Sequence, residues 1–261
     1  MTTVALVTGA TEGIGYELAR CFARGRHDVV LVARDGEKLE RVAAEISASC
    51  GVRVSTIAQD LSGHDGARLL FDEVRRRRIA VDVLVNNAGV GTYGLFAEAD
   101  LERELAMMRL NMISLTVLTK LFLTEMLQRG SGRILNVAST AAFQPGPLMA
   151  VYYASKAYVV SFTEALANEL QGSGIAASVL CPGPTRSGFE ARAGMSASKL
   201  FRRRGVMKAS DVAEIGYREF MKGKTTIIPG LRNKILVFGV RLGPRKLLPS
   251  IVRRFQEPGN P

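Results

Sequence analysis

The sequence predicts an α/β fold in which one doubly wound parallel sheet of about seven strands carries helices on both faces. Short apolar runs alternate with longer amphipathic segments, the order that gives parallel strands joined by right-handed crossovers. A glycine-rich turn follows the first apolar run, and polar clusters follow several later ones. Parallel strands bring their carboxyl ends to one edge of the sheet, so we expect the turn and the clusters to meet there.

Each predicted strand is a short apolar run suited to burial on both faces of a sheet. The strands are expected over residues 4–7, 28–33, 52–58, 81–85, 133–137, 175–180 and 225–228. Helical spacing of apolar residues predicts helices over 16–23, 37–49, 65–78, 101–129, 151–171 and 211–222. Ser210 is the expected cap of the last helix. We expect one domain over 1–261, with an irregular lid over 185–209 and a basic extension over 230–261.

Composition favours a globular cytoplasmic protein. Apolar residues make up 47% and charged residues 23% of the 261 residues. No apolar run approaches the roughly 18 residues that span a bilayer, and the first residues do not resemble a secretion signal. Three scattered cysteines give no disulfide framework, which fits a reducing compartment. Neither His27 nor His64 has a plausible ligand partner in sequence, so no metal site is predicted.

The net charge of +11 is concentrated at the C-terminal end. Residues 1–198 hold 20 basic and 20 acidic side chains, whereas residues 199–261 hold 15 basic and 4 acidic ones. The four arginines at 75–78 are interpreted as a solvated helix end. Nucleic-acid binding is not expected, since aromatic platforms and a known motif are missing from the sequence.

The glycine turn predicts an anion site. Gly9, Gly13 and Gly15 stand between the first strand and the first helix, where backbone N–H groups can hold a pyrophosphate. Their spacing is G-x-x-x-G-x-G and not the common G-x-G-x-x-G, so a purely structural turn is the alternative.

Three further features point to chemistry at the strand ends. Tyr152 and Lys156 lie at i and i+4 of a helix, where the ammonium would lower the pKa of the phenol. Ser139 ends the fifth strand and could hydrogen-bond a carbonyl oxygen, or merely cap a turn. Asn111 lies among apolar residues of a helix, either in a water-linked network to Lys156 or facing solvent.

Taken together, these motifs resemble the short-chain dehydrogenase/reductase superfamily over about residues 3–229. The matching motifs are Thr8-Gly-Ala-Thr-Glu-Gly-Ile-Gly15, Asn86-Asn-Ala-Gly89, Asn111, Ser139, Tyr152-x-x-x-Lys156 and Pro182-Gly183. The resemblance implies a Rossmann-type sheet and an enzyme that reduces a carbonyl with NAD(P)H. Ser139 stands 13 residues before Tyr152, the family's usual spacing, which favours Tyr152 over its rival Tyr153.

The resemblance also implies a role for each matching residue. Tyr152 would donate the proton, Ser139 would hold the developing alkoxide, and Lys156 would lower the Tyr152 pKa and bind the nicotinamide ribose. Asn111 would hold the water of a proton relay. The cofactor-binding residues would be Gly9, Thr11, Glu12, Gly13, Ile14, Gly15, Arg34, Asp60, Leu61, Asn87, Ala88, Gly89, Tyr152, Lys156, Pro182, Gly183 and Thr185.

The end of the second strand favours NADP(H) over NAD(H). An acidic residue there would bind the ribose hydroxyl of NAD, but the chain has Ala33 followed by Arg34, which suits a 2′-phosphate. Glu12 is a departure, because many NADP-preferring relatives carry a basic residue at its position.

The sequence leaves the substrate and the partners open. The predicted pocket walls are apolar, which favours a lipophilic ketone such as a 3-oxoacyl chain or a steroid; they are Ala141, Phe143, Leu148, Met149 and the lid from Phe189 to Phe201. A non-catalytic NADP-binding sensor is the alternative function. The helices over 101–129 and 151–171 predict a homodimer or homotetramer. The basic extension would contact an anionic membrane or hold an acyl carrier. The alternative is that it only covers its own protein, at the substrate cleft or against a neighbouring subunit.

Overall fold

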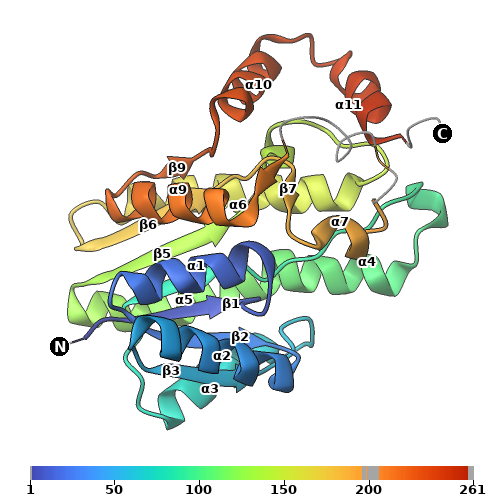
Figure 1. Cartoon of the computed structure of the whole chain (residues 1–261). Helices are drawn as coiled ribbons and strands as arrows, with labels where there is room; N and C mark the ends of the chain where they lie inside the picture. Colours follow the sequence, from blue (N-terminus) through green and yellow to red (C-terminus); the bar gives the residue numbers. More distant parts are fainter. Residues whose placement is uncertain (1, 196–197, 199–205, 258–261) are drawn as a thin grey trace.

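The predicted doubly wound sheet is confirmed in the computed structural model, which describes residues 2–195, 198 and 206–257, with the backbone alone at 241–242 (Figure 1). Its strands pair in parallel in the order β3-β2-β1-β4-β5-β6-β9. The strands are β1 (Val4–Thr8), β2 (Asp28–Ala33), β3 (Val54–Ala58), β4 (Val83–Asn86), β5 (Gly132–Val137), β6 (Ile175–Leu180) and β9 (Thr226–Ile227). The order reverses between β1 and β4, which opens a crevice at the carboxyl ends of these two strands.

Two helical layers cover the sheet (Figure 1). One core lies under α1 (Gly13–Arg24), α2 (Gly36–Cys50) and α9 (Ala209–Met221), and includes Leu18, Phe22, Leu39, Ile46, Val212 and Phe220. The other lies under α3 (Gly66–Arg76), α5 (Leu115–Arg129) and α6 (Ala150–Glu169), and includes Leu70, Val74, Leu118, Phe122 and Leu166. The sheet is therefore buried on both faces, as its near-continuous apolar strands require.

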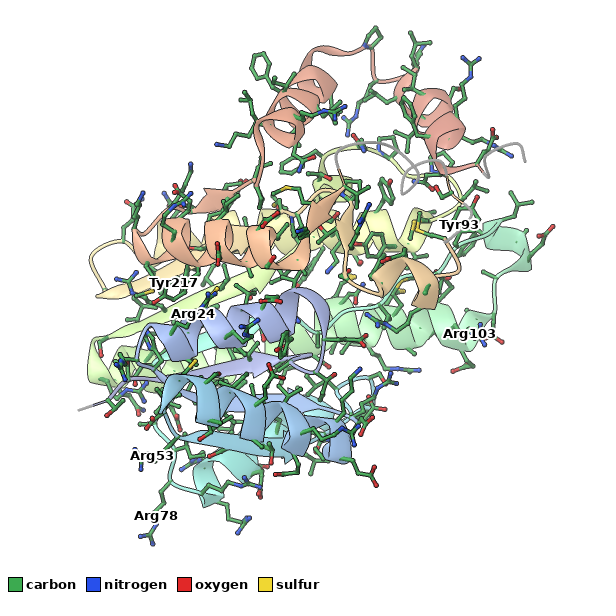
Figure 2. The ribbon with its side chains drawn as sticks, viewed as in Figure 1. Arg24, Arg53, Arg78, Tyr93, Arg103 and Tyr217 are labelled. Carbon is green, nitrogen blue, oxygen red and sulfur yellow. The ribbon has the colours of Figure 1, made fainter. Side chains whose placement is uncertain are left out.

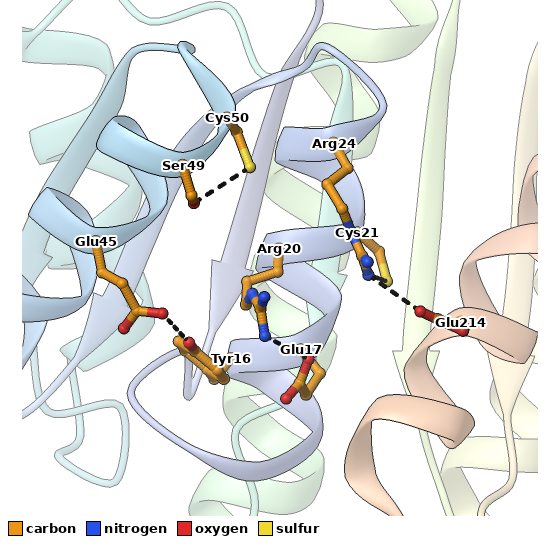
Figure 3. A network of polar contacts seen from close by, with 9 residues as sticks. All are labelled: Tyr16, Glu17, Arg20, Cys21, Arg24, Glu45, Ser49, Cys50 and Glu214. Atoms are coloured by element: carbon orange, nitrogen blue, oxygen red, sulfur yellow. Dashed lines mark hydrogen bonds and ion pairs between the residues drawn. The ribbon is translucent and has the colours of Figure 1, made fainter.

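Local sequence signals set several helix ends. The Asp35 carboxylate caps α2 by accepting a hydrogen bond from the Lys38 amide at 2.9 Å, and α2 ends at Gly51 in the left-handed region with φ +66°. Polar contacts then fix α1 between its neighbours (Figure 3). Tyr16 hydrogen-bonds Glu45 of α2, and Arg24 Nη2 lies 3.4 Å from Glu214 Oε1 of α9.

Two helix predictions are wrong. Helix α9 begins at Ala209, and Ser210 does not cap it, because the β7–β8 pairing of Thr185–Arg186 with Met207–Lys208 delivers the chain directly into the helix. The single helix predicted over 101–129 is interrupted by a π-helical segment at Arg109–Ser114, which separates α4 (Leu101–Met108) from α5. Apolar periodicity does not distinguish a wide turn from an α-helical one.

The segment predicted as an irregular lid contains regular structure. Besides β7 and β8 it holds the short helix α7 (Phe189–Arg192), while residues 196–197 and 199–205 of the predicted lid lie outside the described part of the chain. The basic extension forms α10 (Leu231–Leu242) and α11 (Leu248–Gln256), which stand beyond β9 and apart from the sheet layers (Figure 1). Residues 258–261 of that extension are also outside the description.

Candidate functional site

One cleft of about 680 Å³ lies at the carboxyl ends of the strands. Every residue predicted to bind the cofactor lines this cleft, as do Ser139, Tyr152 and Lys156. Asn111 lies behind the wall and does not line it. The topology therefore gathers residues from well-separated chain segments into one place.

The glycine turn of the cleft is shaped for a close approach. Gly9 and Gly13 have φ of +65° and +58°, a region that side chains disfavour. A Cβ on Gly15 would collide with the backbone carbonyl oxygen of Gly9 and with the side-chain amide nitrogen of Asn87. Glu12, the N-cap residue of α1, makes no side-chain cap hydrogen bond to the helix. The first N–H groups of α1 are therefore available to an anion, and the cradle fits the pyrophosphate of a dinucleotide.

Asn87 holds this turn against β4. Its Nδ2 donates to the carbonyl oxygens of Thr8 and Gly9 at 2.9 and 3.2 Å. The Thr8 hydroxyl accepts from the amides of Asn87 and Ala88, both at 3.0 Å. The Asn86-Asn-Ala-Gly89 motif thus fixes the shape of the glycine turn in addition to lining the cleft.

Tyr152 and Ser139 meet across the cleft wall. Tyr152 is buried, and burial raises its pKa while its hydrogen bond with Ser139 opposes the rise. The sequence predicts that Lys156 would lower this pKa, but burial of the Tyr152 hydroxyl is the largest cause and raises it. Lys156 Nζ donates to the Val137 carbonyl at 3.0 Å and lies 5.8 Å from the centre of the Tyr152 ring. With a pKa raised above the ordinary value for tyrosine, the Tyr152 hydroxyl is expected to keep its proton at neutral pH, which is the form that can donate it.

Ser139 caps a turn, one of the two roles weighed from the sequence, and its contact with a substrate carbonyl stays a prediction. Its hydroxyl accepts a hydrogen bond from the Ala141 amide at 3.1 Å and so caps the turn Thr140–Phe143. The same hydroxyl lies against Tyr152. The turn fixes the position of the serine beside the phenol.

The hydroxyl of Tyr153 faces different partners. Gln256 Nε2, in the last turn of α11, donates to it at 2.6 Å, and Gln144 is a second partner. The hydroxyl of Tyr93, which is labelled in Figure 2, donates a hydrogen bond to the backbone carbonyl oxygen of Gln256 at 2.9 Å. Tyr153 therefore anchors α11 to α6, while Tyr152 is the tyrosine that faces Ser139.

Asn111 is buried, which excludes the solvent-facing alternative. In the π-helical segment its Oδ1 accepts from the Val90 amide at 3.1 Å, and its Nδ2 donates to the Val90 carbonyl and the Ser155 hydroxyl. A Cβ on Gly89 would lie 3.2 Å from Asn111 Oδ1 and 3.3 Å from Lys156 Nζ, so Asn111 and Lys156 flank Gly89. A link between them through water stays a prediction.

A cationic corner lies at the end of β2. Arg34 is exposed, lines the cleft and has no ion-pair partner within 4 Å among the described residues. Burial acts to raise the pKa of Asp60, but hydrogen bonds from Ser62 and the charge of Arg34 outweigh it and lower that pKa. Glu12 pairs with Lys38 at 2.7 Å and with Arg192 of α7. The negative charge of Glu12, which is unfavourable for a 2′-phosphate, is therefore balanced by two cations.

The substrate side of the cleft is only partly the one expected from the sequence. Ala141, Met149 and Phe189 line it, and the Phe189 ring lies 5.2 Å from that of Tyr152. Phe143 and Leu148 do not line it, because Phe143 packs into a core cluster and Leu148 forms a left-handed turn with φ +68°. The predicted wall up to Phe201 falls partly outside the described residues.

The C-terminal helices contribute a wall to the cleft, as one alternative weighed from the sequence expects, but the sequence did not show which residues form it. The wall consists of Arg232, Asn233, Leu236, Val237, Val240, Leu248, Ile251, Val252, Phe255 and Gln256. The amphipathic pattern of 231–256 was visible, but a pattern does not show which cleft a helix covers. Gln256 is one of its polar members, and its side-chain oxygen is buried without a hydrogen-bond partner among the described residues.

Burial of Lys156 has a consequence for stability. It lowers the pKa of Lys156 from 10.5 to about 8, so between these pH values the unfolded chain binds more protons than the folded one. The free energy of unfolding therefore rises with pH in that window. We expect Lys156→Met to melt at or above the parent temperature at pH 7, with its advantage shrinking from pH 8 to 10.5. Melting followed by circular dichroism checks this, with the exposed Lys120→Met as control. A pH-independent difference would contradict it.

These features define a class of protein: a doubly wound α/β protein with a dinucleotide cradle and a Ser–Tyr–Lys set at its strand ends. The family described as short chain dehydrogenase matches residues 3–196, and the chain belongs to this family of oxidoreductases. The predicted family is confirmed. Among the described residues, no group of three His, Cys, Asp or Glu could hold a metal ion.

Relatives and solved structures agree with this placement. The ketoacyl reductase HetN of Nostoc sp. is 33% identical over 88% of this chain and 79% of its own length. The very-long-chain 3-oxoacyl-CoA reductase of Anas platyrhynchos is 36% identical over 68% of this chain, which spans only 58% of that relative. A short-chain dehydrogenase from Sphingobium yanoikuyae in complex with NADPH has a TM-score of 0.82, with 31% identity over 92% of this chain and 94% of that one.

Proposed function

We propose that the protein is an NADPH-dependent reductase that converts a lipophilic ketone or aldehyde to an alcohol, with the 261 residues acting as one catalytic domain. The pairing of buried, neutral Tyr152 with Ser139 beside the dinucleotide cradle carries the proposal. A sensor of NADP(H) would need the cradle but not this pair. The names of the relatives, among them ketoacyl and 3-oxoacyl-CoA reductases, support carbonyl reduction.

The chain's own residues would divide the work as follows. NADPH, when bound, supplies the hydride. Ser139 and Tyr152 hold the substrate oxygen, and the Tyr152 hydroxyl gives that oxygen its proton. Lys156 lies behind Gly89 near the Tyr152 ring, where its ammonium favours the phenolate left after proton donation. Asn111 shapes the wall at Val90 and Gly89, the route by which a water-linked relay would reach Lys156.

NADP(H) is the proposed cofactor, with NAD(H) as the less favoured one. Arg34 offers an exposed guanidinium at the end of β2, and the Glu12 charge is balanced by Lys38 and Arg192. Thr11, Ile14, Leu61, Pro182, Gly183 and Thr185 would complete the site; Thr185 already donates to the Gly183 carbonyl at 2.8 Å. The apolar walls favour a lipophilic substrate. A panel of ketones, followed by loss of NADPH absorbance, tests the proposal.

We also propose a cytoplasmic homodimer or homotetramer. The helical stretch Leu101–Arg129 is apolar and long enough to cross a membrane by length and composition, yet part of it packs in the core, with Leu118 and Phe122 buried. Its other side exposes Met108, Ile113 and Leu127, which pairing with a second copy would cover. Sedimentation at micromolar concentration should show a multiple of 28.2 kDa; a species of 28.2 kDa alone would count against the oligomer.

The basic extension is the remaining partner surface. One alternative for the extension is that it only covers the substrate cleft. Val237 of α10 and Val252 of α11 line the cleft, which supports this role for part of the extension. Contact with an anionic surface, either a membrane or an acyl carrier, is the proposed additional role.

A further inference from the structure

The outward face of α10 is apolar, the reverse of an ordinary surface helix. Leu231, Ile235 and Phe238 share one face at i, i+4 and i+7, and they are 73, 61 and 63% exposed. Val237, on the opposite side, is 7% exposed and lines the cleft. We call Leu231, Ile235 and Phe238 the α10 stripe. A helix that served only to cover its own cleft would have no physical reason to carry this stripe.

Cations surround the α10 stripe. Residues 231–256 include seven lysines and arginines and no aspartate or glutamate. Arg232 and Lys234 flank the stripe on α10, and Arg245 and Lys246 are exposed in the turn that leads to α11. An occupant that complements this surface must be apolar in the middle and anionic around it.

The apolar surface continues into the cleft. Leu236 of α10 and Ile251 and Phe255 of α11 are exposed and also line the cleft. Both helices lie at the same end of the molecule (Figure 1). A partner seated on the α10 stripe would therefore lie at the mouth of the cleft.

We propose that α10 and the α10–α11 turn dock on an anionic lipid bilayer. The α10 stripe enters the boundary of the acyl region, and the flanking lysines and arginines contact the headgroups. The mouth of the cleft then faces the lipid, so a lipophilic substrate can enter without crossing water. This deepens the proposed contact of the basic extension and does not depend on the reaction. A second copy is a poorer occupant, since two-fold pairing through this face would bring the same cations together.

Flotation with vesicles tests the docking. We expect the parent to float with vesicles of phosphatidylglycerol and phosphatidylcholine at low salt and to bind less as salt rises. Ile235→Ser/Phe238→Ser should lower the partition coefficient about tenfold or more, because both side chains leave the lipid. Arg245→Ser/Lys246→Ser should lower it about fivefold per cation on anionic vesicles. Neither pair lines the cleft.

Leu69→Ser/Phe96→Ser is the matched control, because it removes an equally exposed aliphatic and aromatic pair away from the extension. It should float like the parent, and circular dichroism melts show that every variant is folded. Flotation needs no turnover, so its outcome is separate from that of the ketone panel. Three results would overturn the docking: equal flotation of the stripe variant and the parent, a stripe-dependent oligomer without flotation, or binding to an acyl carrier protein without binding to anionic vesicles.

Discussion

Tyr152→Phe is expected to lower kcat for ketone reduction by about 10²–10⁴ and to leave the Kd for NADPH within about threefold of the parent. The substitution removes the hydroxyl that lies against Ser139 and keeps the buried ring. The dinucleotide cradle is built from other segments, chiefly the turn from Gly9 to Gly15 and Asn87. Initial rates and cofactor titration of the purified variant measure the two quantities.

Tyr153→Phe is the matched control, because it removes the same atom one residue along α6. The Tyr153 hydroxyl pairs with Gln256 and not with Ser139, so we expect Tyr153→Phe to lose a little stability and to keep a near-parental kcat. If Tyr152→Phe retains activity within about threefold of the parent, Tyr152 is not the proton donor, since a lost general acid costs far more than that.

Arg34→Asp is expected to lower the ratio of kcat/KM with NADPH to kcat/KM with NADH by about a hundredfold. A charge-assisted contact contributes about 1.5–3 kcal/mol, and the new carboxylate would also repel the 2′-phosphate. The same carboxylate would stand near Asp60, whose pKa the Arg34 guanidinium now helps to lower. Initial rates with both cofactors and one ketone measure the ratio.

Arg41→Asp makes the same charge change nearby, on α2. Arg41 pairs with Glu37 and does not line the cleft, so we expect its cofactor ratio to stay at the parental value. An unchanged cofactor ratio in Arg34→Asp would refute the role of Arg34. An equal fall of the ratio in both variants would show that the overall charge of the protein, and not a contact of Arg34, sets the cofactor preference.

The doubly wound sheet and the cleft at its strand ends could be predicted because their signals are local. Apolar runs mark the strands, and the glycine turn and the Tyr152–Lys156 pair need only short spacings to be recognised. The crossover rule then brings their carboxyl ends together without any further information.

Features that depend on packing could not be predicted. The π-helical turn that turns Asn111 toward Val90 has the same apolar pattern as an α-helix. The net rise in the Tyr152 pKa follows from burial of its hydroxyl, which the i, i+4 spacing of Tyr152 and Lys156 does not show. Glu12 pairs with Lys38 and Arg192, which come from two other chain segments. That these two cations balance the Glu12 charge could therefore be seen only in the folded structure.

Transfer of deuterium to a ketone from NADPH that carries deuterium at both positions of C4 tests the central claim most directly. The parent protein, incubated with the deuterated cofactor and the best ketone of the panel, is expected to give an alcohol with deuterium on the former carbonyl carbon. Mass spectrometry of the product reads the label, and Tyr152→Phe should form about 10²–10⁴ times less of it in the same time. Binding of NADPH without labelled alcohol from any ketone of the panel would contradict the account and identify the protein as a sensor of the cofactor.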